Sequence, residues 1–286
     1  MTRKHYSMLE IHIAVLLFGL AGLFGKWLAL PPTVIVFGRT FFAALTLGAI
    51  LFYTKTSLRA KSRQDQIVLI LLGAVLGVHW VTFFHAIQVS TVAVGLLTFS
   101  TFPLFVTFME PYFFNEKLRG FDMLTAGFVL VGLVLVVPSF DFQNNVTIGA
   151  FWGTMSGFTF AVLVVLNRKY VNAYPSNVIV FYQNCVAAIL LLPFLFFEDF
   201  LFQPSDVLLL VTLGVFCTAL AHALFIKSLL LVKAQLASII ASLEPVYGIL
   251  FAFLLLGEVP ASRTILGGSV ILGTIALSTM KRHTDK

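Results

Sequence analysis

The sequence predicts an all-α polytopic membrane protein whose ten transmembrane helices form two inverted five-helix repeats. Three observations carry this prediction: the composition, the spacing of apolar segments, and an internal match between the two halves. Of 286 residues, 59% are hydrophobic and 10% are charged, whereas about a quarter of the residues of a soluble domain are charged. So little polar surface excludes a pair of soluble domains, a disordered chain, a coiled coil and a disulfide scaffold.

A spanning helix needs about 20 apolar residues, so the chain has room for about ten such helices. The first segment carries Lys26 and is followed by Pro31 and Pro32 rather than by a small-residue cleavage site, so we expect it to remain as a helix. The turn from Ile87 to Ser90 is very short, and an acidic loop with Pro204 separates the seventh and eighth spans. The predicted spans are 9–30, 32–53, 66–86, 91–114, 120–138, 147–167, 176–197, 206–226, 234–256 and 263–280.

The positive charges fall on one side of this arrangement. Of the 18 Lys and Arg residues, all but Lys26, Arg39 and Arg263 lie in the two tails and in the loops that share their side. The positive-inside rule then places both termini in the cytoplasm, in a plasma membrane of the bacterial inner-membrane type. The net charge of +6 therefore reflects topology, and we expect no nucleic-acid partner.

The chain matches itself at an offset of about 142 residues. Residues 98–116 read TFSTFPLFVTFMEPYFFNE and residues 240–258 read IASLEPVYGILFAFLLLGE, which aligns Pro103 with Pro245 and Glu116 with Glu258. The spans divide accordingly into a first repeat, 1–142, and a second repeat, 143–286. Because five is odd, the second repeat enters the membrane in the opposite sense, as in secondary transporters. A channel or a scaffold could also retain such a repeat.

Glu244 is the leading candidate for a functional site. It falls near the middle of the ninth span, where a carboxylate is expensive unless it is neutral, paired or hydrated. It precedes Pro245, and we expect both Pro245 and Pro103 to break their helices and free backbone carbonyls. A carboxyl group beside a broken helix suits a proton or cation site. The alternative is a protonated Glu244 that only shapes the kink.

The other candidates for a substrate or proton site are His79, His222, Trp80, Lys26 and Arg39. Inverted symmetry puts the two histidines on related faces, where imidazole suits a proton relay, although either could simply donate to a backbone carbonyl. Trp80 could line an apolar cavity. Lys26 and Arg39 could attract a substrate carboxylate, or could anchor the helix ends.

Several glycines recur at helical spacing and predict close helix packing. They are Gly73, Gly77, Gly149, Gly153 and Gly157. We expect no metal site, because no two potential ligands fall at helical i, i+4 spacing facing a cysteine or a carboxylate. We also expect no cofactor and no catalytic residue, because the chain has no phosphate loop and no HExxH or GxSxG motif. An enzyme would need paired carboxylates or clustered histidines at one depth, and a channel would need a continuous polar stripe.

The sequence resembles the EamA family of the drug/metabolite transporter superfamily. The resemblance rests on Ser242 to Val246 with Leu256-Gly257-Glu258, and on Pro103 with Asn115-Glu116, where the family usually has Gly at the Asn position. Gly77 to Trp80 and Phe83 to Ala86 also match a subset of the family. The resemblance covers the whole chain and implies a ten-helix basket whose fifth and tenth helices lie at the periphery.

Together these features predict a secondary transporter. We expect it to export small, amino-acid-like or amphipathic metabolites by alternating access, with proton coupling as a further feature. The alternative is an uncoupled facilitator of a small metabolite. The expected partners are the lipid bilayer and a small-molecule substrate, and the sequence is compatible with a homodimer.

Overall fold

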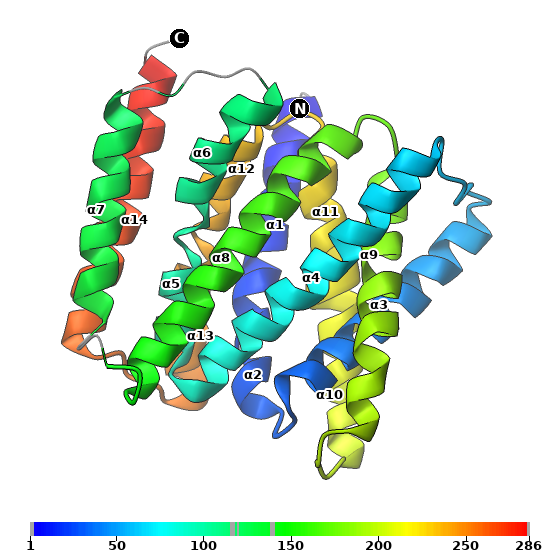
Figure 1. The fold of residues 1–286 in the computed structure, drawn as a ribbon, viewed down its shortest axis with the longest axis horizontal. Coiled ribbons are helices and arrows are strands. Elements are labelled where there is room, and N and C mark those ends of the chain that lie inside the picture. The colour runs from blue at the N-terminus through cyan, green and yellow to red at the C-terminus, as the bar shows by residue number, and fades with distance from the viewer. Residues whose placement is uncertain (1–2, 115–117, 119, 138–140, 285–286) are drawn as a thin grey trace.

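A computed structural model describes residues 3–114, 118, 120–137 and 141–284, and every regular element in those ranges is helical (Figure 1). A 3-10 turn at Leu192–Phe196 follows α9, and a π-helical segment at Val215–Leu220 joins α10 to α11. The helices are α1 Arg3–Ala21, α2 Phe24–Trp27, α3 Pro32–Tyr53, α4 Arg63–Val89, α5 Val92–Phe99, α6 Phe102–Phe114, α7 Gly120–Val136, α8 Asn145–Tyr170, α9 Ser176–Leu191, α10 Pro204–Gly214, α11 Ala221–Ser228, α12 Ala234–Ala241, α13 Glu244–Leu256 and α14 Ser262–Thr284.

Seven helical segments in the described part of the chain are long and apolar enough to cross a membrane. They coincide with seven of the predicted spans, from Tyr6–Trp27 to Pro204–Ser228. The remaining predicted spans, 120–138, 234–256 and 263–280, contain the shorter apolar helices Met123–Val136, Glu244–Leu256 and Ser262–Leu277. The all-helical class is therefore confirmed for the described residues, while the count of ten spans stays a prediction.

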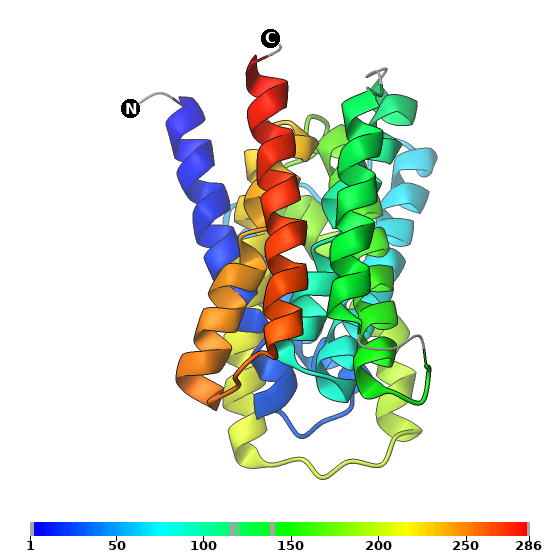
Figure 2. The same ribbon diagram turned by 90° about the vertical axis from the view of Figure 1, so that its left-hand side faces the viewer.

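The helices stand side by side in one bundle, with α7 and α14 upright in Figure 1 and α3, α4 and α8 inclined to them (Figures 1 and 2). Helices α7 and α14 pack on each other at one edge, while α4 packs on α8 and α9 near the middle and α3 packs on α9 at the other edge. The first turn of α1 and the last turn of α14 lie at the same end of the bundle. The basic segment between α3 and α4 lies at that end as well, which agrees with the grouping of charges in the sequence.

Two membrane segments are broken at matching positions. Helix α5 stops at Phe99 and α6 starts at Phe102, and α12 stops at Ala241 and α13 starts at Glu244, in each case 142 residues later. Pro103 and Pro245 are the second residues of α6 and α13, where a missing N–H and a fixed φ are tolerated. Each proline therefore starts a new helix segment, and the break itself falls on the residues just before it.

Glycines let α8 approach the short helix α5 closely. A Cβ added to Gly149 would meet the Ser90 side chain, one added to Gly153 would meet Thr98, and one added to Gly157 would meet the Phe99 carbonyl. In α4, Gly73 faces Val186 of α9 in the same way, whereas a Cβ on Gly77 would make only ordinary contacts, the nearest with Ala187. Four of the five predicted packing glycines are thus places where a side chain does not fit.

Replacing Gly153 with leucine should destabilise the protein, because overpacking a close helix contact costs about 1–3 kcal/mol. A Cβ added to Gly127 of α7 would have no other atom within 4 Å, so Gly127→Leu provides a matched control. Both changes gain the same helix propensity, so the difference between their melting temperatures in detergent isolates the packing effect. Equal melting temperatures would contradict the close approach of α8 to α5.

Candidate functional site

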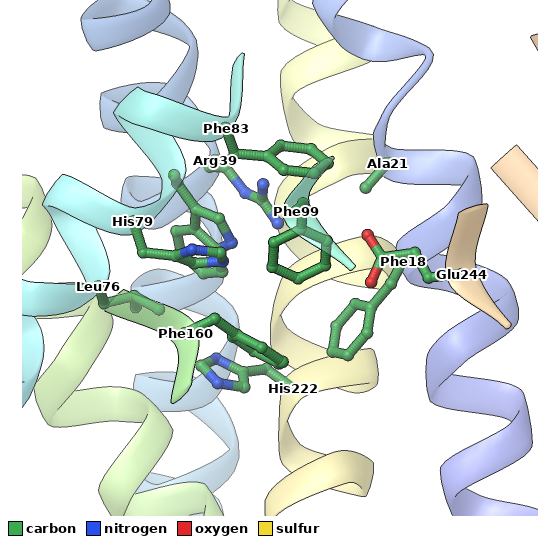
Figure 3. Close-up of a pocket in the computed structure, with 11 residues that line it drawn as sticks. Phe18, Ala21, Arg39, Leu76, His79, Phe83, Phe99, Phe160, His222 and Glu244 are labelled. Carbon is green, nitrogen blue, oxygen red and sulfur yellow. The ribbon is translucent and has the colours of Figure 1, made fainter. Parts of the chain in front are cut away.

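A small cavity lies in the middle of the bundle, between segments that are distant in the sequence (Figure 3). Its volume is about 30 Å³, which is room for about two water molecules. Helices α1, α3, α4, α5, α8, α11 and α13 each contribute side chains. The lining residues are Phe18, Ala21, Arg39, Leu76, His79, Trp80, Phe83, Phe99, Phe160, His222 and Glu244.

Arg39 is the most unusual of these side chains, because it is a guanidinium that is only 1% exposed. Its Nε donates to Thr218 Oγ1 at 3.0 Å, and one terminal nitrogen donates to the Cys217 carbonyl at 3.5 Å. The guanidinium lies over the Trp80 ring at 3.8 Å from the centroid, a cation–π contact that gains strength away from water. The π-helical segment and α4 therefore hold this charge in place, and its other N–H groups have no hydrogen-bond partner among the described residues, so they can meet a ligand.

The π-helical segment between α10 and α11 creates the acceptor for Arg39. Within it, Thr218 Oγ1 donates to the carbonyl of Leu213, five residues earlier, at 2.8 Å. A π-bulge displaces carbonyls from the regular pattern, and such bulges occur often at functional sites. Here it turns the Cys217 carbonyl and the Thr218 hydroxyl toward Arg39.

Glu244 enters the same cavity as the first residue of α13. It is 4% exposed, and Figure 3 draws its carboxyl group directed into the space beside Phe18 and Phe99. The N-terminal end of a helix carries partial positive charge, which favours a carboxylate there. The structure describes no hydrogen bond from Arg39 to Glu244, so both side chains line one cavity without a direct hydrogen bond between them.

The two histidines are held differently. His79 Nδ1 lies 2.9 Å from Ser156 Oγ and 3.1 Å from the Ser156 carbonyl, which fixes the ring against α8. His222 is 1% exposed, and its Nδ1 has no hydrogen-bond partner among the described residues. Its ring instead packs edge-on against Trp80 at 5.7 Å. His222 therefore has a polar atom available to water or to a ligand in the cavity.

Five of the six residues predicted for a substrate or proton site thus come together: Arg39, His79, Trp80, His222 and Glu244. The sixth, Lys26, does not line the cavity. It belongs to α2, a helix that lies at the end of the bundle opposite the termini (Figure 1), and its Nζ donates to the carbonyl of Ser90 at 2.9 Å.

The connection between α4 and α5, which Lys26 binds, also binds an acidic residue from the second half of the chain. Glu258, just after α13, accepts from the backbone N–H groups of Val92 and Ala93, each at 3.2 Å. Lys26 and Glu258 thus bind the two ends of the α4–α5 connection, each with the charge that the nearby helix end favours.

Sequence reasoning missed the phenylalanines of the cavity, although the repeat contains a signal for two of them. At an offset of 142, Phe18 matches Phe160 and Trp80 matches His222, and all four line the cavity. The charged residues do not follow this register, because Arg39 aligns with Phe181 and Glu244 aligns with Phe102. Four ring-bearing residues of the cavity thus follow the internal repeat, whereas its two charged residues do not.

The sequence matches the EamA-like transporter family over residues 6–137 and again over residues 147–280. A solved structure described only as a crystal structure of a protein has the same fold, with a TM-score of 0.73 over 98% of this chain and 97% of that one, at 18% identity.

Named relatives are transporters. An uncharacterised transporter, YxxF, of Bacillus subtilis is 24% identical and covers 98% of this chain and 92% of its own length. A pseudopaline exporter, CntI, of Pseudomonas aeruginosa is 25% identical, with 88% of each chain covered. An S-adenosylmethionine uptake transporter of Rickettsia conorii is 24% identical, with 84% of this chain and 80% of its own covered. These likenesses point to a membrane transporter rather than an enzyme.

Proposed function

The chain belongs to the EamA-like transporter family, and from this premise we propose that it is a secondary transporter that exports small, amphipathic metabolites by alternating access. The observation that carries the proposal is the central cavity, where Arg39 and Glu244 are buried among aromatic rings. Charged groups inside a membrane protein are expensive and mark substrate or ion sites. The second half of the chain has Phe181 where the first has Arg39, so the fold itself does not require a charge there.

The architecture we propose is ten membrane helices in two inverted repeats. Helices α1 and α8 begin 142 residues apart, as do α7 and α14. In Figure 1, α1 begins at the end that holds the termini, whereas α8 begins at the opposite end. Two such halves allow two pseudo-symmetric closures around one central site, with the broken helices beside it.

The substrate we propose carries a carboxylate and an apolar body, as an amino acid does. Arg39 can bind a carboxylate with two parallel N–H groups, and the rings of Phe18, Phe99 and Phe160 can cover an apolar part. Glu244 would exchange a proton, or bind a substrate ammonium group. The name of the pseudopaline exporter favours export, whereas that of the S-adenosylmethionine transporter describes uptake.

An uncoupled facilitator is the second candidate. It would use the same cavity without a proton step at Glu244.

The cavity is too small for a metabolite, so transport requires the bundle to open on each side in turn. On the side of Lys26, Gly19 of α1 packs against the backbone of Gly248 of α13. The hydrogen bonds that Glu258 accepts connect the end of α13 to the start of α5. We propose that these contacts form the outer gate, with both termini on the cytoplasmic side of a bacterial inner membrane.

Replacing Glu258 with alanine should weaken this gate, because two backbone N–H groups at the start of α5 lose their acceptor. We expect a membrane-impermeant thiol reagent added outside to label a cysteine introduced at Ala21 several-fold faster in this variant. Asp199→Asn removes an exposed acid that lies in the loop before α10, and it should leave the labelling rate unchanged. Equal rates in the Glu258 variant and its parent would contradict an outer gate at this place.

The proposed function is tested by transport into and out of proteoliposomes. Vesicles containing the purified protein are loaded with one of a panel of labelled amino acids, and efflux is measured with and without a pH gradient. We expect saturable efflux of at least one compound, accelerated by an inward proton gradient. Ion conductance without transport of any member of a broad metabolite panel would overturn the proposal.

A further inference from the structure

A second hollow lies far from the central cavity, at the end of the bundle that holds the termini. It is a groove of about 560 Å³ between the last turns of α3 and the helix α9. Apart from Lys55 and Thr56, its lining consists of apolar side chains and one glycine. The lining residues are Gly48, Leu51, Phe52, Lys55, Thr56, Leu58 and Phe181.

The groove opens at the level where the membrane surface is expected. Phe52 and its neighbour Tyr53 are each 88% exposed at the end of α3, as aromatic residues are at a membrane–water interface. Gly48 lets the ring of Phe181 pack closely on α3, since a Cβ there would lie 3.1 Å from that ring, and both residues line the groove. The lining therefore combines apolar side chains with Lys55 and Thr56 beside the exposed aromatic residues.

A lysine that forms no ion pair with another described residue lies at the rim. Lys55 lines the groove, is exposed, and has a φ of 51°, a conformation that non-glycine residues rarely adopt. Arg59, Lys61 and Arg63 follow within eight residues. The nearest acidic residue in the sequence, Asp65, already accepts a hydrogen bond from the Tyr174 hydroxyl at 2.7 Å.

Two tyrosines of the second half of the chain hold this basic segment in a fixed shape. The Tyr182 hydroxyl donates to the Leu58 carbonyl at 2.6 Å, and the Lys61 N–H donates to the Tyr174 hydroxyl at 2.7 Å. The Lys61 ammonium also lies 5.5 Å from the centroid of the Tyr174 ring. The positive charges are thus presented by an ordered loop beside an apolar groove.

We propose that this groove is a binding site for one anionic phospholipid. The phosphate would bind at Lys55, and an acyl chain would lie in the groove along Phe52 and Phe181. Basic pockets between membrane helices on the cytoplasmic side suit anionic head groups, and each nearby cation adds about 1 kcal/mol of attraction. A soluble phosphate would leave the apolar residues of the groove uncovered. A zwitterionic lipid would not balance the positive charge of the segment between α3 and α4.

The test is native mass spectrometry of the full protein in detergent, after exchange into equal amounts of phosphatidylglycerol and phosphatidylcholine of the same chain length. We expect one phosphatidylglycerol to remain bound in preference to phosphatidylcholine, and added inorganic phosphate not to displace it. Lys55→Ala should reduce that retention several-fold. Gly48→Leu, which fills the groove but keeps every charge, should reduce it as well.

Lys169→Ala is the matched control, because Lys169 is an exposed cation at the same end, at the last turn of α8. It should retain the lipid as the parent does. Equal retention of the two lipids, or equal loss in the Lys55 and Lys169 variants, would overturn the proposal. So would displacement by inorganic phosphate, which would indicate an anion site without a lipid. Because the readout is lipid retention, it is independent of whether the protein transports the compounds tested.

Discussion

Replacing Glu244 with glutamine is expected to abolish the response of transport to a pH gradient. Glutamine has nearly the same shape as glutamic acid but cannot bind or release a proton, and Glu244 is the carboxyl group that lines the central cavity. For one coupled proton, a difference of one pH unit is worth about 1.4 kcal/mol, so wild-type protein would sustain up to about a tenfold substrate gradient. The variant should sustain none.

The measurement compares substrate efflux from proteoliposomes with and without an inward proton gradient. Exchange of substrate at equal pH on both sides serves as the internal control, because it reports folded protein that still binds substrate. Glu198→Gln, a change of another acid outside the cavity, should leave the pH response intact. A Glu244→Gln variant that still responds to the gradient would refute the proton role, and a wild-type protein that never responds would favour the uncoupled facilitator.

Replacing Arg39 with lysine is expected to reduce transport of carboxylate substrates at least tenfold. Lysine keeps the positive charge but loses the planar fork and the stacking that place the guanidinium on Trp80. It also loses the geometry that reaches both Thr218 and the Cys217 carbonyl. The effect should be strongest on the apparent affinity for the substrate, because the charge that remains is no longer held in place.

The readout that separates recognition from folding is selectivity. We expect the ratio of apparent affinities for an amino acid and for its decarboxylated amine to fall in Arg39→Lys. Arg263→Lys is the control, because Arg263 is exposed and its Nε donates to the Leu135 carbonyl far from the cavity. An unchanged ratio in the Arg39 variant would show that this guanidinium does not recognise the carboxylate.

Much of the fold follows from the sequence because membrane helices are recognisable by length and hydropathy. The predicted breaks at Pro103 and Pro245 coincide with the ends of α5 and α12 to within a few residues. Composition also identified the rare polar residues inside spans, and five of the six candidates line the cavity. A charge inside an apolar segment is such an uncommon event that it points to a site without any knowledge of the fold.

The rest depended on tertiary structure. Nothing in the residues from Val215 to Leu220 distinguishes a π-helical segment from a regular turn, so the partners of Arg39 could not be predicted. In the sequence, Lys26 and Arg39 are both cations near the same helix ends, and only the greater distance of Arg39 from the turn favours a buried role for it. They differ because Lys26 reaches the carbonyls at the end of α4, whereas Arg39 faces the interior of the bundle.

The most direct test of alternating access is the accessibility of the cavity from each side of the membrane. Ala21 lines the cavity and is small, so Ala21→Cys in a protein with Cys185 and Cys217 replaced by serine gives a mild reporter. Only the backbone carbonyl of Cys217 bonds to Arg39, and serine keeps it. In oriented vesicles, alternating access predicts labelling by an impermeant thiol reagent from either side, with substrate slowing both reactions. Labelling from one side only, unchanged by any transported substrate, would contradict it.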